Sequence, residues 1–135
     1  MKQLRQFGLL AAVASVCFVL AANGSAKTAD KDMATAAVER GRMIFQHQCA
    51  PCHGQGPGDD GPAQLPGTAA LQRKYSGELP AALEKRTDLT ADIIRSFVRN
   101  GSGAMPMFRK PELSDAAIDD IAAYLKASAA SQPAD

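Results

Sequence analysis

Cys49-Ala50-Pro51-Cys52-His53 is the stretch on which the rest of the chain depends. Two cysteines that are separated by two residues and followed at once by a histidine form the attachment pattern of a c-type haem. The spacing suits the chemistry, because both thiols must reach the vinyl groups on one edge of the macrocycle while the imidazole turns toward the iron. The motif therefore predicts one haem c, attached covalently through Cys49 and Cys52, with His53 as an axial ligand of the iron.

The segment from Gly103 to Met107 offers a second ligand for that iron. Met105 lies in a glycine-rich loop and is followed by Pro106, which restrains the backbone. A methionine thioether opposite a histidine favours Fe(II) and raises the reduction potential. We therefore expect Met105 to be the ligand on the opposite face of the haem, with Met107 as the alternative.

The first 26 residues have the three-part plan of a secretory signal peptide. Lys2 and Arg5 form a short basic start, an almost unbroken apolar run covers residues 7–22, and small residues lead up to Ala26. The run is shorter than the roughly 20 residues that a bilayer-spanning helix needs, and an uncleaved membrane anchor is the alternative. We expect cleavage at or near Ala26, a periplasmic location and no stable membrane insertion afterwards.

Charge and cysteine content argue against several classes of protein. The whole chain has a formal net charge of +1, which disfavours nucleic acid or a membrane surface as the main partner. Cys17 lies in the apolar run and would leave with the signal, so Cys49 and Cys52 would be the only cysteines of the mature chain. Two neighbouring cysteines cannot staple a small exported fold together with disulfides.

After the signal, the sequence divides into a flexible arm over residues 27–34, one domain over residues 35–129 and a short tail over residues 130–135. No segment of the domain shows the period-two alternation of a strand. Its apolar residues recur instead at helical spacing. The domain is therefore predicted to be all-α.

The first helix of the domain is predicted from about Thr35 to the cysteine motif. Val38, Gly41, Phe45 and Cys49 fall at spacings of three, four and four, which places them on one face of a helix. Gly41 is informative because glycine inside a helix costs about 1 kcal/mol relative to alanine. We expect a second helix to approach closely at that position.

Capping residues mark two further helices. Thr90 begins one that ends at Gly101, and Ser114 begins the last helix. Two short helical segments are predicted before them, over residues 68–75 and 80–86. The predicted buried residues are Ile93, Ile94, Phe97 and Val98 in the earlier long helix, and Ile118, Ile121, Tyr124 and Leu125 in the last one.

Taken in order, these elements resemble the small class I c-type cytochromes, and the likeness covers nearly all of the mature sequence. In that family, a glycine and an aromatic residue of the N-terminal helix pack against an aliphatic and an aromatic residue of the last helix. The matching residues here are Gly41 and Phe45, with Ile121 and Tyr124. The resemblance implies the class I cytochrome c fold, in which the N- and C-terminal helices pack crosswise around one covalently bound haem.

Gly61-Pro62 matches the family's Gly-Pro pair that follows the haem motif. In the family, the proline carbonyl accepts a hydrogen bond from the second ring nitrogen of the histidine ligand. The resemblance therefore implies that Pro62 belongs to the haem site, where such a bond would orient His53 and raise its basicity. The segment from Asn100 to Pro106 likewise resembles the loop that delivers the methionine ligand.

A narrower resemblance concerns the kind of redox partner. Three segments, residues 79–80, 86–90 and 98–101, resemble those of cytochromes that accept electrons from periplasmic dehydrogenases. This implies a periplasmic one-electron carrier between a dehydrogenase donor and the respiratory chain, with an oxidase or another cytochrome as acceptor. The alternative is a tightly bound cytochrome subunit of a flavin- or quinone-dependent dehydrogenase complex.

Two hypotheses of another class remain beside the carrier. An open-site haem enzyme or sensor requires that Met105 does not bind the iron. A CxxC thiol oxidoreductase requires a strand before the motif and a sheet around it, and neither is predicted. No nucleophile and base pair is evident in the sequence, so we assign no catalytic residue and do not expect an enzyme.

Basic residues flank the methionine loop, and two interpretations of them remain open. Arg99, Arg109 and Lys110 are either ordinary solvated side chains or a basic rim that steers an acidic partner toward the haem edge. Candidate contacts for a haem propionate are Arg73, Lys74 and Tyr75.

Overall fold

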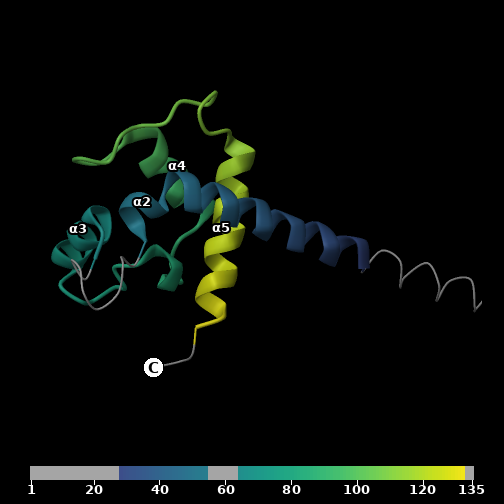
Figure 1. Cartoon of the computed structure of the whole chain (residues 1–135), viewed down its shortest axis with the longest axis horizontal. Helices are drawn as coiled ribbons and strands as arrows, with labels where there is room; N and C mark the ends of the chain where they lie inside the picture. Colours follow the sequence, from purple (N-terminus) through teal and green to yellow (C-terminus); the bar gives the residue numbers. More distant parts are fainter. Residues whose placement is uncertain (1–27, 55–63, 133–135) are drawn as a thin grey trace, which may run out of the picture. The chain divides into compact units, whose positions relative to one another are not determined.

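The computed structural model describes residues 28–54 and 64–132. The predicted signal peptide, Pro62 and the end of the predicted tail lie outside these residues. The helices are a first helix over residues 28–48, α2 (Ala50–His53), α3 (Pro66–Tyr75), the short 3-10 helix η2 (Leu83–Lys85), α4 (Ala91–Asn100) and α5 (Asp115–Ala130) (Figure 1). No strand occurs among the described residues, where Ser102 and Met105 make an isolated bridge. The all-α prediction is confirmed.

The first helix begins earlier than the sequence predicted. The prediction of a flexible arm over residues 27–34 was wrong about its secondary structure, since residues 28–34 are helical. This segment lacks an apolar stripe, but it is rich in good helix formers such as alanine and contains no glycine or proline. Helix propensity therefore extends the helix where no periodic pattern predicts it.

Residues 1–35 and 36–135 form separate compact units, and the fold is described below for the second unit.

The first helix crosses α5 within residues 36–48 (Figure 1), and Gly41 lies at the crossing against the backbone of α5. A Cβ atom added to Gly41 would lie 1.9 Å from the carbonyl oxygen of Asp120 and 3.0 Å from the amide nitrogen of Ile121. The Phe45 and Tyr124 rings lie beside this crossing, with their centroids 5.4 Å apart. The predicted close approach of a second helix is confirmed, and glycine is the residue that permits it.

A compact apolar core holds the first helix, α4 and α5 together. Its buried members are Phe45, Val98, Leu113, Ile118, Ile121 and Leu125. Burial of a side chain of this size stabilises the fold by roughly 1.5–3 kcal/mol relative to leaving it exposed. The predicted core face of the last helix is confirmed, with Tyr124 packed at its edge.

The predicted buried stripe of α4 is only half correct. Val98 is buried and Ile94 packs against the core, but Ile93 and Phe97 are exposed by 37% and 41%. Residues four apart share a helix face, so Ile93 and Phe97 form a strip beside the one that Ile94 and Val98 occupy. The core covers one of these two neighbouring strips and leaves the other open.

The predicted helix caps are present. The Thr90 hydroxyl accepts a hydrogen bond from the Ile93 amide at 3.3 Å, and the Ser114 hydroxyl accepts one from the Ala117 amide at 3.1 Å. The segment predicted to be helical over residues 80–86 contains only η2. Within residues 28–54 and 64–132, no helix combines the length and apolar character that a bilayer-spanning segment needs.

Candidate haem-binding site

The cysteine motif forms a helical turn that continues directly from the first helix. The Cys49 amide donates to the Phe45 carbonyl at 2.9 Å, and the His53 amide donates to the Cys49 carbonyl at 2.8 Å. Pro51 fits because it lies in the first turn of α2, where its missing amide hydrogen has no partner to lose. Cys49 and His53 are therefore one turn apart and lie on one side of the helix.

The two thiols lie in different environments. Cys49 is half-buried against the core, Cys52 is exposed, and both are free. Burial raises the pKa of the Cys49 thiol to about 11. The reactive cysteine of a thiol oxidoreductase has a lowered pKa, and that class also needs a strand before the motif. Among the described residues there is no strand, so the structure argues against the thiol oxidoreductase hypothesis.

His53 has the character of a metal ligand. The ring is half-buried, and its Nδ1 atom is buried without a hydrogen-bond partner among the described residues. Burial also lowers the pKa of His53, which favours the neutral ring that binds metals. A buried polar atom without a partner is uncommon in proteins. The partner expected from the family, the carbonyl of Pro62, lies outside the described residues, so that bond stays a prediction.

The first turn of α3 closes one side of His53. A Cβ atom on Gly67 would lie 2.9 Å from Cε1 of the imidazole ring and 2.7 Å from the carbonyl oxygen of Cys52. The next residue, Thr68, is buried, and its hydroxyl donates to the Gly54 carbonyl at 2.6 Å. Sequence reasoning missed both residues, although glycine and threonine directly after Pro66 at a helix start were the available signal.

Met105 lies at the end of a tight turn that follows α4. The Ser102 amide donates to the Met105 carbonyl at 3.1 Å, and the Met105 amide donates back to the Ser102 carbonyl at 3.0 Å. Gly101 and Gly103 both have positive φ angles, 67° and 58°. A Cβ atom on Gly101 would lie 2.7 Å from the Met105 carbonyl oxygen. Gly101 is therefore required for its backbone angle and for the space it leaves.

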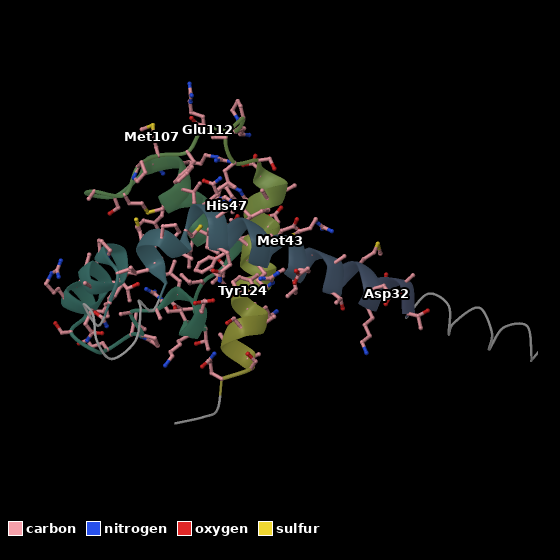
Figure 2. The ribbon with its side chains drawn as sticks, in the orientation of Figure 1. Asp32, Met43, His47, Met107, Glu112 and Tyr124 are labelled. Atoms are coloured by element: carbon pink, nitrogen blue, oxygen red, sulfur yellow. The ribbon has the colours of Figure 1, made fainter. Side chains whose placement is uncertain are left out.

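The two methionines of this loop differ in burial. Met105 is partly buried and packs against the core, whereas Met107 is 63% exposed and projects from the outer edge of the loop (Figure 2). A ligand that is held against the core loses less freedom on binding than an exposed one. The structure therefore favours Met105 over Met107.

The residues around the motif fit a c-type haem. They offer two free thiols, a neutral imidazole and a thioether, which is the donor set that class of cofactor uses. The second ring nitrogen of a metal-bound histidine usually donates to a partner, and the buried Nδ1 atom of His53 is free for such a bond among the described residues. Ile93 and Phe97 leave apolar surface open, which a flat apolar group can cover.

The residues expected near a propionate are only partly brought together. The Lys74 Nζ atom lies 5.3 Å from the centroid of the Tyr75 ring, and the guanidinium of Arg86 lies 4.9 Å from it. Arg86, which sequence reasoning missed, is buried and ion-paired with Asp88. Hydrogen bonding to Arg86 is the main cause that lowers the pKa of Tyr75. Arg73 is exposed and stays a prediction.

The basic residues beside the loop are paired with carboxylates of the chain itself. Arg109 lies 2.9 Å from Glu112, while Lys110 and Arg99 lie 2.8 and 2.6 Å from Asp115. Hydrogen bonds from these cations lower the pKa values of Glu112 and Asp115 to about 2 each. The structure therefore weakens the interpretation of these three residues as a free basic rim.

Comparison with known proteins agrees with this geometry. The family model described as cytochrome C oxidase, cbb3-type, subunit III, matches residues 36–125. The chain is 35% identical over 85 residues to cytochrome c6 of Leptolyngbya boryana, a match that covers 63% of this chain and 85% of that protein. It is 32% identical over 95 residues to cytochrome c6 of Cyanidium caldarium, covering 70% and 74%. No solved structure matches the chain.

The family match extends from the first helix into α5 and includes the cysteine motif and the methionine loop. Covalent attachment of one haem c through Cys49 and Cys52 follows from the family and from the spacing of these residues. Proteins of this family transfer electrons and are not enzymes by themselves. The chain thus belongs to the cytochrome c family, as a small class I c-type cytochrome with an electron-transfer role.

Proposed function

We propose that this cytochrome is a periplasmic carrier that takes single electrons from a dehydrogenase and passes them to the respiratory chain. The observation that carries the proposal is the pair of candidate ligands, a half-buried His53 and a loop-restrained Met105. They lie on separate elements that both pack against one core. The family supports electron transfer, and the dehydrogenase follows from the sequence resemblance alone.

A haem held here would supply one-electron redox chemistry. Cys49 and Cys52 would hold the macrocycle, and His53 and Met105 would bind its iron. With two protein ligands on the iron, the chain's own residues would tune and shield it instead of performing bond chemistry. Gly67 leaves room for the His53 ring to pack closely, and Gly101 allows the backbone of the loop to approach the Met105 carbonyl.

The first experiment is an absorption spectrum of the exported protein, oxidised and reduced, beside Met105→Ala and Met107→Leu. We expect a c-type spectrum whose weak far-red ferric band, the signature of methionine ligation, is lost in Met105→Ala and kept in Met107→Leu. A band that survives in Met105→Ala would contradict Met105 as the ligand. Carbon monoxide binding by the resting reduced protein would favour the open-site enzyme or sensor instead.

The dehydrogenase partner requires a separate test. The tagged cytochrome is isolated from periplasmic extract at low salt, and the eluate is examined for flavin or quinone enzymes that reduce it. Reduction by an enzyme that separates readily supports the free carrier. An enzyme that remains bound in fixed proportion supports the tightly bound subunit, and a protein that no periplasmic dehydrogenase reduces would contradict both.

A further inference from the structure

We infer that Arg99 is a positioning residue that holds the methionine loop, residues 101–113, in the shape that presents Met105. Arg99 lies near the C-terminal end of α4, and its side chain is 19% exposed. Among the described residues, its hydrogen bonds go to Phe108, Leu113 and Asp115 and none goes to Met105 itself. The inference rests on Met105 being the ligand in the proposed function, and it adds the residue that keeps the ligand in place.

The Arg99 guanidinium spans the second half of the methionine loop. Its Nη1 atom donates to the Phe108 carbonyl at 2.9 Å, and its Nη2 atom donates to the Leu113 carbonyl at 2.8 Å. Nη2 also donates to Oδ1 of Asp115, the first residue of α5, at 2.6 Å. One side chain therefore joins the end of α4, two points of the loop and the start of α5.

The chemistry of this junction calls for an arginine. Two backbone carbonyls and a carboxylate converge on it, and carbonyls that are removed from water must be paired. A guanidinium presents several donors in one rigid plane, whereas the ammonium of lysine is a single flexible point of charge. Asp115 orients the plane, and it is itself held by Lys110 at 2.8 Å. The hydrogen bonds of this junction therefore have a fixed geometry, unlike those of an exposed ion pair.

Met105 lies between the two fixed ends of its loop. At the first end, the turn of Ser102 and Met105 follows directly on α4. At the second end, the Phe108 amide donates to the Val98 carbonyl at 2.8 Å, and the Phe108 carbonyl accepts from Arg99. Without Arg99 the second end keeps the backbone hydrogen bond from Phe108 to Val98 and the ion pair of Lys110 with Asp115, but the Phe108 and Leu113 carbonyls lose their side-chain donor, and the residues from Met105 to Leu113 gain freedom to move away from the core.

The test compares Arg99→Leu with Arg95→Leu in the haem-loaded protein. Arg95 is one helical turn earlier on α4 and is ion-paired with Asp92 at 2.5 Å and Asp119 at 2.6 Å. Among the described residues, its hydrogen bonds go to Asp92 and Asp119 and none goes to the loop, while its guanidinium approaches Asp115 at 3.8 Å. The two variants lose the same charge from the same helix, but only one of them releases the loop.

The readout is the rate at which imidazole replaces the methionine ligand in the ferric protein, followed at the far-red band. We expect Arg99→Leu to increase this rate by about tenfold, the size expected from losing one or two hydrogen bonds to partly buried carbonyls. Arg95→Leu should stay within about twofold of the parent because loss of an exposed ion pair has little effect. Equal rates in both variants, or an unchanged rate in Arg99→Leu, would overturn the inference.

If Arg99→Leu fails to accumulate, Arg99→Lys decides the question. Lysine keeps the charge beside Asp115 but cannot reach both carbonyls with a planar group, so imidazole should again enter faster than in the parent. A parental rate in Arg99→Lys would overturn the inference. The Met105→Ala spectrum separates the two proposals: if the far-red band survives there, the ligand assignment fails, and if it is lost while the Arg99 variants behave as the parent, only the role of Arg99 fails.

Discussion

The segment that carries His53 and the segment that carries Met105 are held in different ways. His53 ends a helical turn that continues from the first helix, and α3 packs against it through the bare backbone of Gly67. Met105 lies in a loop whose shape depends on two glycines with positive φ and on the three hydrogen bonds of Arg99. One segment is fixed by helix geometry and close packing, the other by a polar network.

The difference predicts which ligand is lost first. Close packing inside a helical turn yields only when the surrounding fold yields, because packed interiors resist small displacements. A loop held by a few hydrogen bonds can open locally at a lower free energy than global unfolding. We therefore expect the methionine side to open while the histidine side stays intact, and matched substitutions can test this.

The largest effect is expected from Gly67→Ala. Alanine generally favours a helix more than glycine does. At position 67, however, its Cβ atom would lie 2.7 Å from the Cys52 carbonyl oxygen and 2.9 Å from the His53 ring. Overpacking against backbone should lower the free energy of unfolding by about 3 kcal/mol and displace His53. Urea unfolding of the haem-loaded protein measures the first effect, and NMR of the ligand ring protons measures the second. Unfolding and ring signals that match the parent would contradict close packing as the restraint on His53.

The same change on the other side, Gly101→Ala, should act on the methionine alone. It combines an unfavourable φ of 67° with a Cβ only 2.7 Å from the Met105 carbonyl oxygen. We expect a loss of stability of about 2 kcal/mol and loss of the far-red band, with the histidine signals unchanged. Gly103→Ala is the control, because its φ is also positive but open space surrounds it. If both variants keep the band, the backbone at Gly101 does not restrain the ligand.

Thr68→Val should weaken the histidine side without adding bulk. The valine keeps the shape of threonine but removes the hydroxyl that donates to the Gly54 carbonyl at 2.6 Å. Leaving that buried carbonyl unpaired should cost about 1–2 kcal/mol of unfolding free energy. Thermal unfolding measures the loss, with Thr87→Val, at an exposed position, as the control. Equal melting temperatures of the two variants would show that the hydroxyl bond adds nothing.

Acid should open the methionine side before the histidine side. The pKa of Asp115 is lowered from 3.8 to about 2 by hydrogen bonds, first from Lys110 and then from Arg99. Because the folded-state pKa lies below the unfolded one, this stabilisation is complete above about pH 5 and is lost as the pH falls toward 2. The far-red band should therefore fade on acid titration, and the band of the Asp115→Asn variant should fade at a higher pH than that of the parent. If the two titration curves coincide, Asp115 does not help to hold the loop.

The smallest effect is expected from Arg109→Gln. Arg109 is exposed and already paired with Glu112 at 2.9 Å, so its loss changes the surface potential little beyond that pair. The rate of electron transfer to an acidic redox partner, measured across a range of salt concentrations, should change by less than about twofold. A large loss that appears only at low salt would restore the basic rim as a docking surface.

The helix crossing and the caps could be predicted because each depends on residue types at fixed spacing. Gly41 predicted the close approach of a second helix because a glycine inside a helix otherwise costs stability, and the family resemblance implied that this is the last helix. Thr90 and Ser114 predicted helix starts. The exposure of Ile93 and Phe97 could not be predicted in this way. Periodicity gives the apolar side of a helix but not how far the core extends around it.

The restraints on the candidate site were harder to predict than the candidate ligands. Cys49, Cys52 and His53 form a local motif, so their proximity follows from the chain itself. Arg99 instead donates hydrogen bonds to carbonyls 9 and 14 residues away. Because every residue has a backbone carbonyl, the sequence does not indicate which carbonyls an arginine will bind. Gly67 lies against a ring 14 residues earlier in the chain, and no local spacing rule pairs these two positions.

The crossing at Gly41 also has a consequence for the order of folding. It joins positions 80 residues apart, as the Arg40–Asp120 hydrogen bonds show, so its formation must close a large loop, which slows folding. A chain emerging from its N-terminus presents the cysteine motif before α5 exists. We therefore expect the two thiols to be accessible to haem-attaching chemistry before the crossing with the last helix forms.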